Sequence, residues 1–112
     1  MISHVVDIKT GSVNDLLTPG GTLKIKGGKL KIAGDNPQVG VFFEDEAGNT
    51  VKIDERDIVV NNPSELIVQI PPLTAGRYQL TICTQFSGSA TLLKEPRTAV
   101  LKKSLPYNNQ TL

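Results

Sequence analysis

Residues that could act as nucleophiles or metal ligands are few in this sequence. It contains one cysteine, Cys83, and one histidine, His4. A Cys–His or Ser–His–Asp hydrolase would have to use His4, close to the start of the chain, and no Gly-x-Ser-x-Gly motif is present. A zinc site needs three or four Cys, His or carboxylate ligands, which this composition scarcely provides. We therefore expect no enzyme activity, no metal and no cofactor.

Acidic side chains are concentrated in two nearby segments. Glu44-Asp45-Glu46 and Asp54-Glu55-Arg56-Asp57 could hold calcium between neighbouring loops. They lack the Asp-x-Asp-x-Asp-Gly spacing of a calcium loop, so a solvated face is the favoured interpretation. Gly20-Gly21 and Gly27-Gly28 flank predicted strands and open no helix, so no phosphate-binding loop is predicted either.

One cluster of positive charge stands above the background. It consists of four lysines that alternate with apolar residues: Lys24, Lys26, Lys29 and Lys31. If both halves of this segment are strands, the lysines share the outer face of a sheet. They could there touch DNA phosphates or an acidic partner, including the acidic loop of another copy. The favoured alternative is a lysine-bearing edge that prevents aggregation between sheets.

The bulk composition is that of an ordinary globular domain. The chain has 112 residues, with 12 Lys and Arg against 11 Asp and Glu and a net charge of +1. This balance excludes a disordered charged tail and a protein that bulk charge alone would hold to nucleic acid. No apolar run is long enough to span a membrane, no signal-peptide pattern opens the sequence, and a lone cysteine forms no internal disulfide. These features favour a cytoplasmic protein.

The elements that must position these residues are predicted to be strands, because apolar residues recur at every second position. The predicted strands are His4–Ile8, Thr22–Lys26, Lys29–Ile32, Val39–Phe43, Val51–Ile53, Ile58–Val60, Glu65–Ile70, Arg77–Phe86 and Thr98–Leu101. The exception is the segment Ser12–Leu17, which could form a single helical turn capped by Ser12.

Two of these strands have consequences for the candidate residues. The alternating runs on either side of Gly27-Gly28 predict a hairpin; alternatively, only the first run lies in the sheet and the second crosses over to the next one. In Arg77–Phe86, Cys83 lies on the face opposite Tyr78, as a small and inert strand residue. The residues expected inside are Tyr78, Leu80, Ile82, Thr84 and Phe86, and those expected outside are Gln79, Thr81 and Gln85.

Seven or eight short strands with regularly spaced turns predict an all-β sandwich. The sequence contains no internal repeat, no linker and no second domain. We expect a single domain over residues 1–112, with an ordered core from about 4 to 105 and a polar tail, 106–112, that frays.

A corner between sheets is predicted just before the longest strand. Gly76 allows the positive φ that a sharp corner needs, and Tyr78 can bury its ring while its hydroxyl turns back to a backbone group. This is the tyrosine corner of immunoglobulin-like Greek-key sandwiches, here with about seven strands. Together with Pro19–Gly27, it resembles the Ig-like modules of the IPT/TIG kind.

A closer resemblance extends from His4 to about Leu105. It is carried by Leu17–Gly21, Val39–Phe43, Asn62–Leu66, Ile70-Pro71, Gly76–Tyr78, Thr84–Phe86 and Leu92–Arg97. These segments are similar to a bacterial Ig-like family of unknown function that is typically joined C-terminal to an HU-like DNA-binding domain. The most specific piece is Thr84-Gln85-Phe86 followed by Leu93–Arg97. The family has no established catalytic or ligand residues, so the resemblance assigns none.

The resemblance implies a non-catalytic accessory or protein-interaction module, the C-terminal domain of a bacterial HU-like DNA-binding protein. The HU-like part would bind and bend DNA, while this domain would contact partners or copies of itself, away from any membrane and, if so attached, on the nucleoid. The alternative is an extracellular carbohydrate-binding or adhesion module. Sugar sites usually present exposed aromatic rings, however, and the chain has no Trp and two Tyr.

Overall fold

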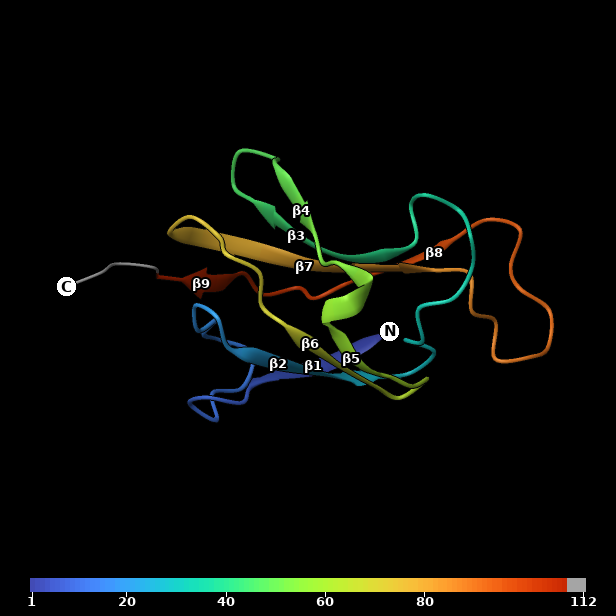
Figure 1. Cartoon of the computed structure of the whole chain (residues 1–112), viewed down its shortest axis with the longest axis horizontal. Helices are drawn as coiled ribbons and strands as arrows, with labels where there is room; N and C mark the ends of the chain where they lie inside the picture. Colours follow the sequence, from blue (N-terminus) through green and yellow to red (C-terminus); the bar gives the residue numbers. More distant parts are fainter. Residues whose placement is uncertain (109–112) are drawn as a thin grey trace.

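The chain folds as two antiparallel sheets packed face to face in a computed structural model that describes residues 1–108 (Figure 1). The first sheet has the order β1 (Ile2–Asp7), β2 (Thr22–Gly27), β6 (Glu65–Gln69), β5 (Ile58–Asn61). The second has the order β4 (Thr50–Lys52), β3 (Gly40–Asp45), β7 (Gly76–Thr84), β8 (Arg97–Val100), with β9 (Leu105–Tyr107) also pairing with β7. The predicted all-β sandwich is thus confirmed.

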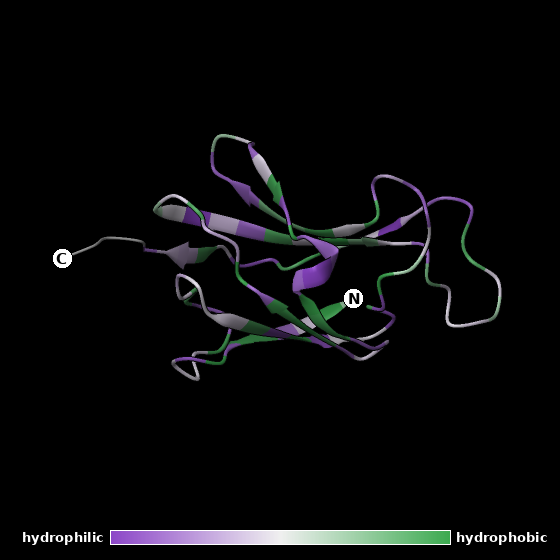
Figure 2. Ribbon diagram, viewed as in Figure 1, coloured by the Kyte–Doolittle hydropathy of each residue, from purple (hydrophilic) through white to green (hydrophobic). Residues whose placement is uncertain are grey.

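The core lies between the sheets because strand residues point alternately inward and outward. Apolar residues recur along the strands of both layers (Figure 2). The largest side chains that are almost completely buried are Phe43, Leu23, Ile25, Leu30, Ile53, Leu66, Leu80, Ile82 and Leu105. Each sheet therefore has one apolar face and one face open to solvent.

The predicted hairpin at Gly27-Gly28 is wrong, and the alternative, a crossover, is what the structure shows. The chain leaves β2 and passes to the second sheet without forming another strand before β3. The amide of Leu30 donates to the carbonyl of Pro63, and that of Ile32 to the side chain of Asn61. These long-range partners replace the ladder that a local hairpin would have made.

Beside the crossover, the 3-10 turn η1 (Glu55–Asp57) connects β4 of one sheet with β5 of the other (Figure 1). Asp54 caps this turn by accepting a hydrogen bond from the amide of Arg56. That side is therefore closed by a short covalent link.

The predicted helical turn at Ser12–Leu17 is also wrong. Asn14 has a φ of 53°, and isolated bridges connect Val13 with Val6 and Leu17 with Tyr107. The amide of Leu17 donates to the carbonyl of Pro106 at 2.9 Å. This segment closes part of the side of the sandwich, between β1 and β9.

A fraying tail from residue 106 is wrong for its first residues, since Pro106 and Tyr107 belong to β9 and Tyr107 is 3% exposed. Its hydroxyl accepts a buried hydrogen bond from the amide of Leu73. A single aromatic ring in a polar stretch was too weak a signal to predict a strand. Residues 109–112 lie outside the described part of the chain.

The long strand β7 has the predicted register through Thr84. Tyr78, Leu80, Ile82 and Thr84 are buried between the sheets, and Cys83 faces the other way. Beyond Thr84 the strand has ended, so Gln85 is buried although it was predicted outside, and Phe86 is only half-buried.

Candidate functional site

The four lysines do not form a continuous stripe. Lys24 and Lys26 lie on the outer face of β2, whereas Lys29 and Lys31 follow the strand in the crossover. Because β2 lies between β1 and β6, it is not an edge, and the interpretation as a protected edge is wrong. The ammonium of Lys26 pairs with Glu65 at 3.2 Å.

Cys83 and His4 lie on opposite sides of the molecule. His4 projects from the outer face of β1, in register with Lys26, and Cys83 from the outer face of β7 in the other sheet. Cys83 is 8% exposed and receives a weak hydrogen bond from the hydroxyl of Thr98 at 3.9 Å. The structure therefore does not bring these two residues together as a nucleophile and a base.

The two acidic segments are occupied with local structure. Hydrogen bonds from the backbone of Asn49, with weaker ones from its side chain and from Ala47, lower the pKa of the Asp45 carboxyl. Hydrogen bonds from Arg56 lower the pKa of Asp54 from 3.8 to about 2. Within residues 1–108, no three His, Cys, Asp or Glu side chains are grouped as metal ligands.

The corner before β7 has the geometry of a tyrosine corner. The hydroxyl of Tyr78 donates to the carbonyl of Thr74 at 2.8 Å and lies 3.1 Å from the hydroxyl of the same threonine. Gly76 has a φ of 153°. The Tyr78 ring packs edge-on against Phe43 and Tyr107, with centroids 6.4 and 6.2 Å away.

Thr84 and Gln85 fasten two long loops to the end of β7, and we call this pair the clasp. The hydroxyl of Thr84 donates to the carbonyl of Lys31 at 2.6 Å and accepts from the amide of Ala33 at 3.1 Å. The Gln85 side chain accepts from the amide of Asn36 at 3.1 Å. The two residues thus hold the crossover loop, 28–39, against the second sheet.

Gln85 also holds the loop that leads to β8. Its side-chain amide donates to the carbonyl of Leu93 at 2.8 Å, while its backbone carbonyl accepts from the amide of Leu93. Gly34 packs so closely on the Gln85 amide that a Cβ would overlap Oε1, and its φ of 113° is one that favours glycine. The residues that carry the most specific part of the resemblance are therefore anchors of the loops.

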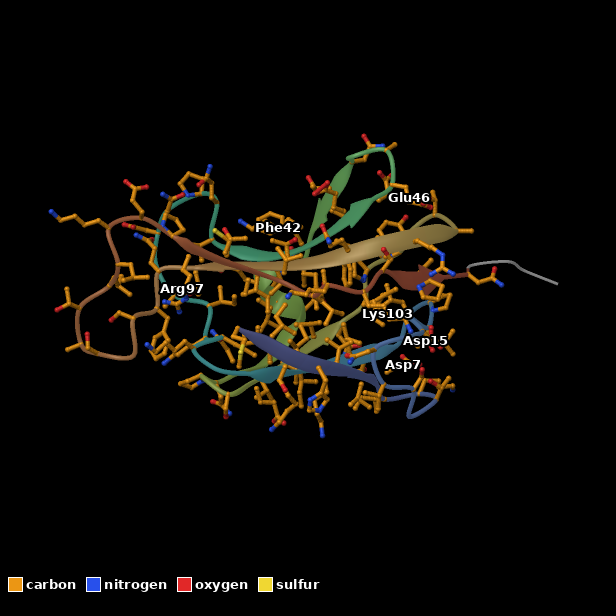
Figure 3. The ribbon with its side chains drawn as sticks, turned by 180° about the vertical axis from the view of Figure 1, so that it is seen from behind. Asp7, Asp15, Phe42, Glu46, Arg97 and Lys103 are labelled. Carbon is orange, nitrogen blue, oxygen red and sulfur yellow. The ribbon has the colours of Figure 1, made fainter. Side chains whose placement is uncertain are left out.

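Arg97 completes this end of the molecule. Its guanidinium donates to the carbonyls of Lys29 and Phe86, at 3.0 and 2.8 Å. Figure 3 shows Arg97 between the layers at the end where the long loops lie. Backbone carbonyls are neutral acceptors, so these contacts leave the positive charge of Arg97 without a neutralising carboxylate.

A cleft of about 690 Å³ lies between the start of β1 and the segment 97–103. Ile2, Ala99 and Leu101 supply apolar lining, and Arg97, Lys102 and Lys103 supply the cationic side chains in its wall. This cleft was not predicted from the sequence, although the two adjacent lysines directly after the last predicted strand were a visible signal.

A second hollow, of about 410 Å³, lies between the crossover loop and η1. Asn61, in its wall, exchanges two hydrogen bonds with the backbone of Ile32, and the ammonium of Lys52 donates to the carbonyl of Pro37 at 3.4 Å. These side chains are thus engaged in holding the loop.

A comparison with models of protein families matches residues 1–99 to the family described as a domain of unknown function (DUF4469) with an Ig-like fold. The chain belongs to this family. This match confirms the resemblance inferred from the sequence, together with the Ig-like form of the sandwich. A comparison with curated proteins finds no match to this DUF4469 domain.

Among solved structures, the DUF4469 domain is similar to a crystal structure from Bacteroides vulgatus, provisionally described as a bacterial DNA-binding protein. The two share 35% sequence identity with a TM-score of 0.89. The match covers 96% of this chain but 46% of the other, so the domain spans less than half of that protein.

Two features of the DUF4469 domain bear on the alternative functions. Tyr78, Tyr107 and Phe43 are buried and Phe42 and Phe86 are half-buried, so none of the five aromatic rings forms an open platform for a sugar. Residues 1–108 include no helix that could cross a membrane.

Proposed function

We propose that this DUF4469 domain is a non-catalytic interaction module of a bacterial DNA-binding protein and that an attached HU-like domain makes the DNA contacts. The observation that carries the proposal is the similarity to a protein that is provisionally described as DNA-binding. The matched domain makes up less than half of that protein. The rest of that protein is long enough to hold a separate DNA-binding unit. The proposal places the protein in the cytoplasm, on the nucleoid.

The charges of the domain are consistent with DNA being bound by another part of the protein. Its net charge is +1, and the sequence's densest lysine cluster is divided between a strand and a loop, with Lys26 paired to Glu65. A few phosphate contacts give weak, salt-dependent binding, on the order of 10⁻⁴ M at physiological salt. Affinity for DNA must then come from elsewhere in the protein.

The test has two arms. In the first, the isolated domain is titrated into a short DNA duplex at physiological salt, where we expect no binding tighter than on the order of 10⁻⁴ M. In the second, the matched domain is removed from the Bacteroides vulgatus protein, and we expect the remainder to keep its DNA affinity. Circular dichroism verifies that each protein is folded.

Either of two results would overturn the proposal. Micromolar binding of duplex by the isolated domain would show that it is itself a DNA-binding surface. Loss of DNA binding by the shortened Bacteroides vulgatus protein would show that the module is needed for the DNA contact. Replacing Lys24, Lys26, Lys29 and Lys31 with Gln then tells whether the lysine cluster is responsible.

A further inference from the structure

The strand β8 has one unpaired edge. It is the last strand on its side of the sheet order and pairs with β7 alone. Just beyond it, the amide of Leu101 donates to the carbonyl of Leu80, which fixes the phase of the ladder. Because backbone groups alternate in direction along a strand, those of Thr98 and Val100 point away from β7. They present a template for one more strand.

The neighbouring edges are covered, and this one is not. The segment from Ser12 to Leu17 bonds to the edge of β1 through Asp7 and Val5 and to β9 through Pro106. Beside β8 there is instead the 690 Å³ cleft, which begins where that cover ends. Among residues 1–108, the structure thus leaves this edge beside an open cleft.

The cleft has a composition that suits an extended peptide. Ala99 and Leu101 alternate with Thr98 along the segment, and Ala99 and Leu101 face inward beside Ile2. A bound strand would place every second side chain against these apolar residues and the others in solvent. Main-chain hydrogen bonds would supply affinity, and the apolar floor would select for side-chain size.

The charges around the cleft are of one sign. Its lining includes Arg97, Lys102 and Lys103 and no acidic residue. Arg97 donates hydrogen bonds to carbonyl oxygens. The ammonium of Lys103 lies 3.9 Å from the carboxylate of Asp15, and the two side chains are 59% and 50% exposed (Figure 3). An exposed pair of this length contributes little, so the positive potential remains available.

The positive potential distinguishes between the molecules that could bind in the cleft. The same edge of a second copy carries the same positive charges, so edge-to-edge pairing of two copies is repelled. A duplex nucleic acid would meet the positive charges, but it could not use the apolar floor or the strand edge. An extended segment with acidic residues at its ends uses all three features.

We propose that the cleft beside β8 binds an extended, acidic segment of a partner protein, which adds a strand to the second sheet. The inference rests on the proposed function as an interaction module and names the class of partner. In this arrangement, apolar side chains of the segment contact Ile2, Ala99 and Leu101, and its acidic ends lie near Arg97 and Lys102-Lys103.

The probe is a fluorescent peptide, Asp-Glu-Val-Thr-Val-Thr-Val-Glu-Asp, whose binding is followed by fluorescence anisotropy. A matched peptide carries Lys in place of every Asp and Glu. We expect the acidic peptide to bind and the basic one not to bind. Amide resonances of Thr98 and Val100 should shift most in a heteronuclear NMR titration, because their backbone groups would gain partners.

Charge and backbone pairing are tested separately. The double variant Lys102→Glu/Lys103→Glu should weaken binding of the acidic peptide by at least about tenfold. Lys9→Glu/Lys94→Glu makes the same change in net charge at exposed sites outside the cleft and should leave affinity nearly unchanged. N-methylation of alternate peptide amides tests the pairing without altering the protein: one alternate set should abolish binding and the other should not.

The overturning results are distinct from those of the DNA experiment. No binding of the acidic peptide, equal loss in both double variants, or equal tolerance of both N-methylated sets would overturn the strand-addition site while leaving the interaction-module proposal intact. Displacement of the peptide by a short DNA duplex at physiological salt would also overturn it, and would assign the cleft to nucleic acid, against the proposed function as well.

Discussion

The contribution of the tyrosine corner to stability can be tested by removing a single oxygen atom. Tyr78→Phe removes the hydroxyl that donates to the carbonyl of Thr74 at 2.8 Å and leaves the ring. The edge-on contacts with Phe43 and Tyr107 and the burial of the ring, now 3% exposed, are therefore kept. The change therefore separates the hydrogen bonding of this hydroxyl, to the carbonyl and the hydroxyl of Thr74, from the packing of the ring.

The expected loss follows from where the acceptor lies. Thr74 is an exposed residue, so water can approach its carbonyl once the phenol oxygen is gone. The cost is then the net value of one hydrogen bond, about 1 kcal/mol, without the larger penalty of an unsatisfied buried group. For a domain of this size, that loss lowers Tm by about 4 °C.

Urea unfolding followed by circular dichroism measures the loss, with the m-value as a check that the unfolded state is unchanged. Tyr107→Phe is the matched comparison, because its hydroxyl accepts a fully buried hydrogen bond from the amide of Leu73. We expect it to cost at least as much as Tyr78→Phe. A Tyr78→Phe protein with an unchanged midpoint and m-value would refute the assignment of a stabilising corner.

Three further predictions concern single residues. Gly76→Val should destabilise the domain by about 1–3 kcal/mol, because valine is strained at a φ of 153° although open space surrounds the new Cβ; a melting curve like that of the native protein would contradict this. Cys83, 8% exposed, should react with a thiol reagent far more slowly in the native protein than in denaturant, and equal rates would show that it is accessible. An NMR titration of Asp54 should give a midpoint near 2, and Arg56→Ala should return it toward 3.8. The lowered pKa adds a small stability above pH 3.8 that is lost as the pH falls through about 2. An unchanged midpoint in the variant would show that Arg56 does not lower this pKa.

Most of the strands, and the corner, could be predicted from the sequence because both are local patterns; the exceptions are the expected strand Lys29–Ile32, which does not form, and β9, which was missed. A period of two identifies a strand wherever one face is buried, and Gly76 two residues before Tyr78 is a short-range signal. The crossover after β2 was not decidable in this way. The same alternation around Gly27-Gly28 also suits a hairpin. What favours the crossover over the hairpin is the bonding of Leu30 to Pro63 and of Ile32 to Asn61, partners about thirty residues further along the chain.

The candidate site was less predictable than the fold for a related reason. Whether Lys102 and Lys103 flank an open edge depends on how far the segment 12–17 covers β1 and β9, which no local pattern shows. The lysines at 24–31 drew attention because they alternate along the sequence, yet the structure divides them between a central strand and a loop. Spacing predicts a shared face only where the strand continues.

The clasp has a consequence for the order of events in folding. Ala33, Asn36 and Leu93 acquire their hydrogen-bonding partners only when Thr84 and Gln85 are in place at the end of β7. The two loops should therefore become ordered after β7 has joined the second sheet, and they should open together as one local unit during native-state hydrogen exchange. In Gln85→Ala, the amides of the strands should then exchange as before, while the amides of both loops should exchange faster. A single side chain would thus control a local unfolding transition.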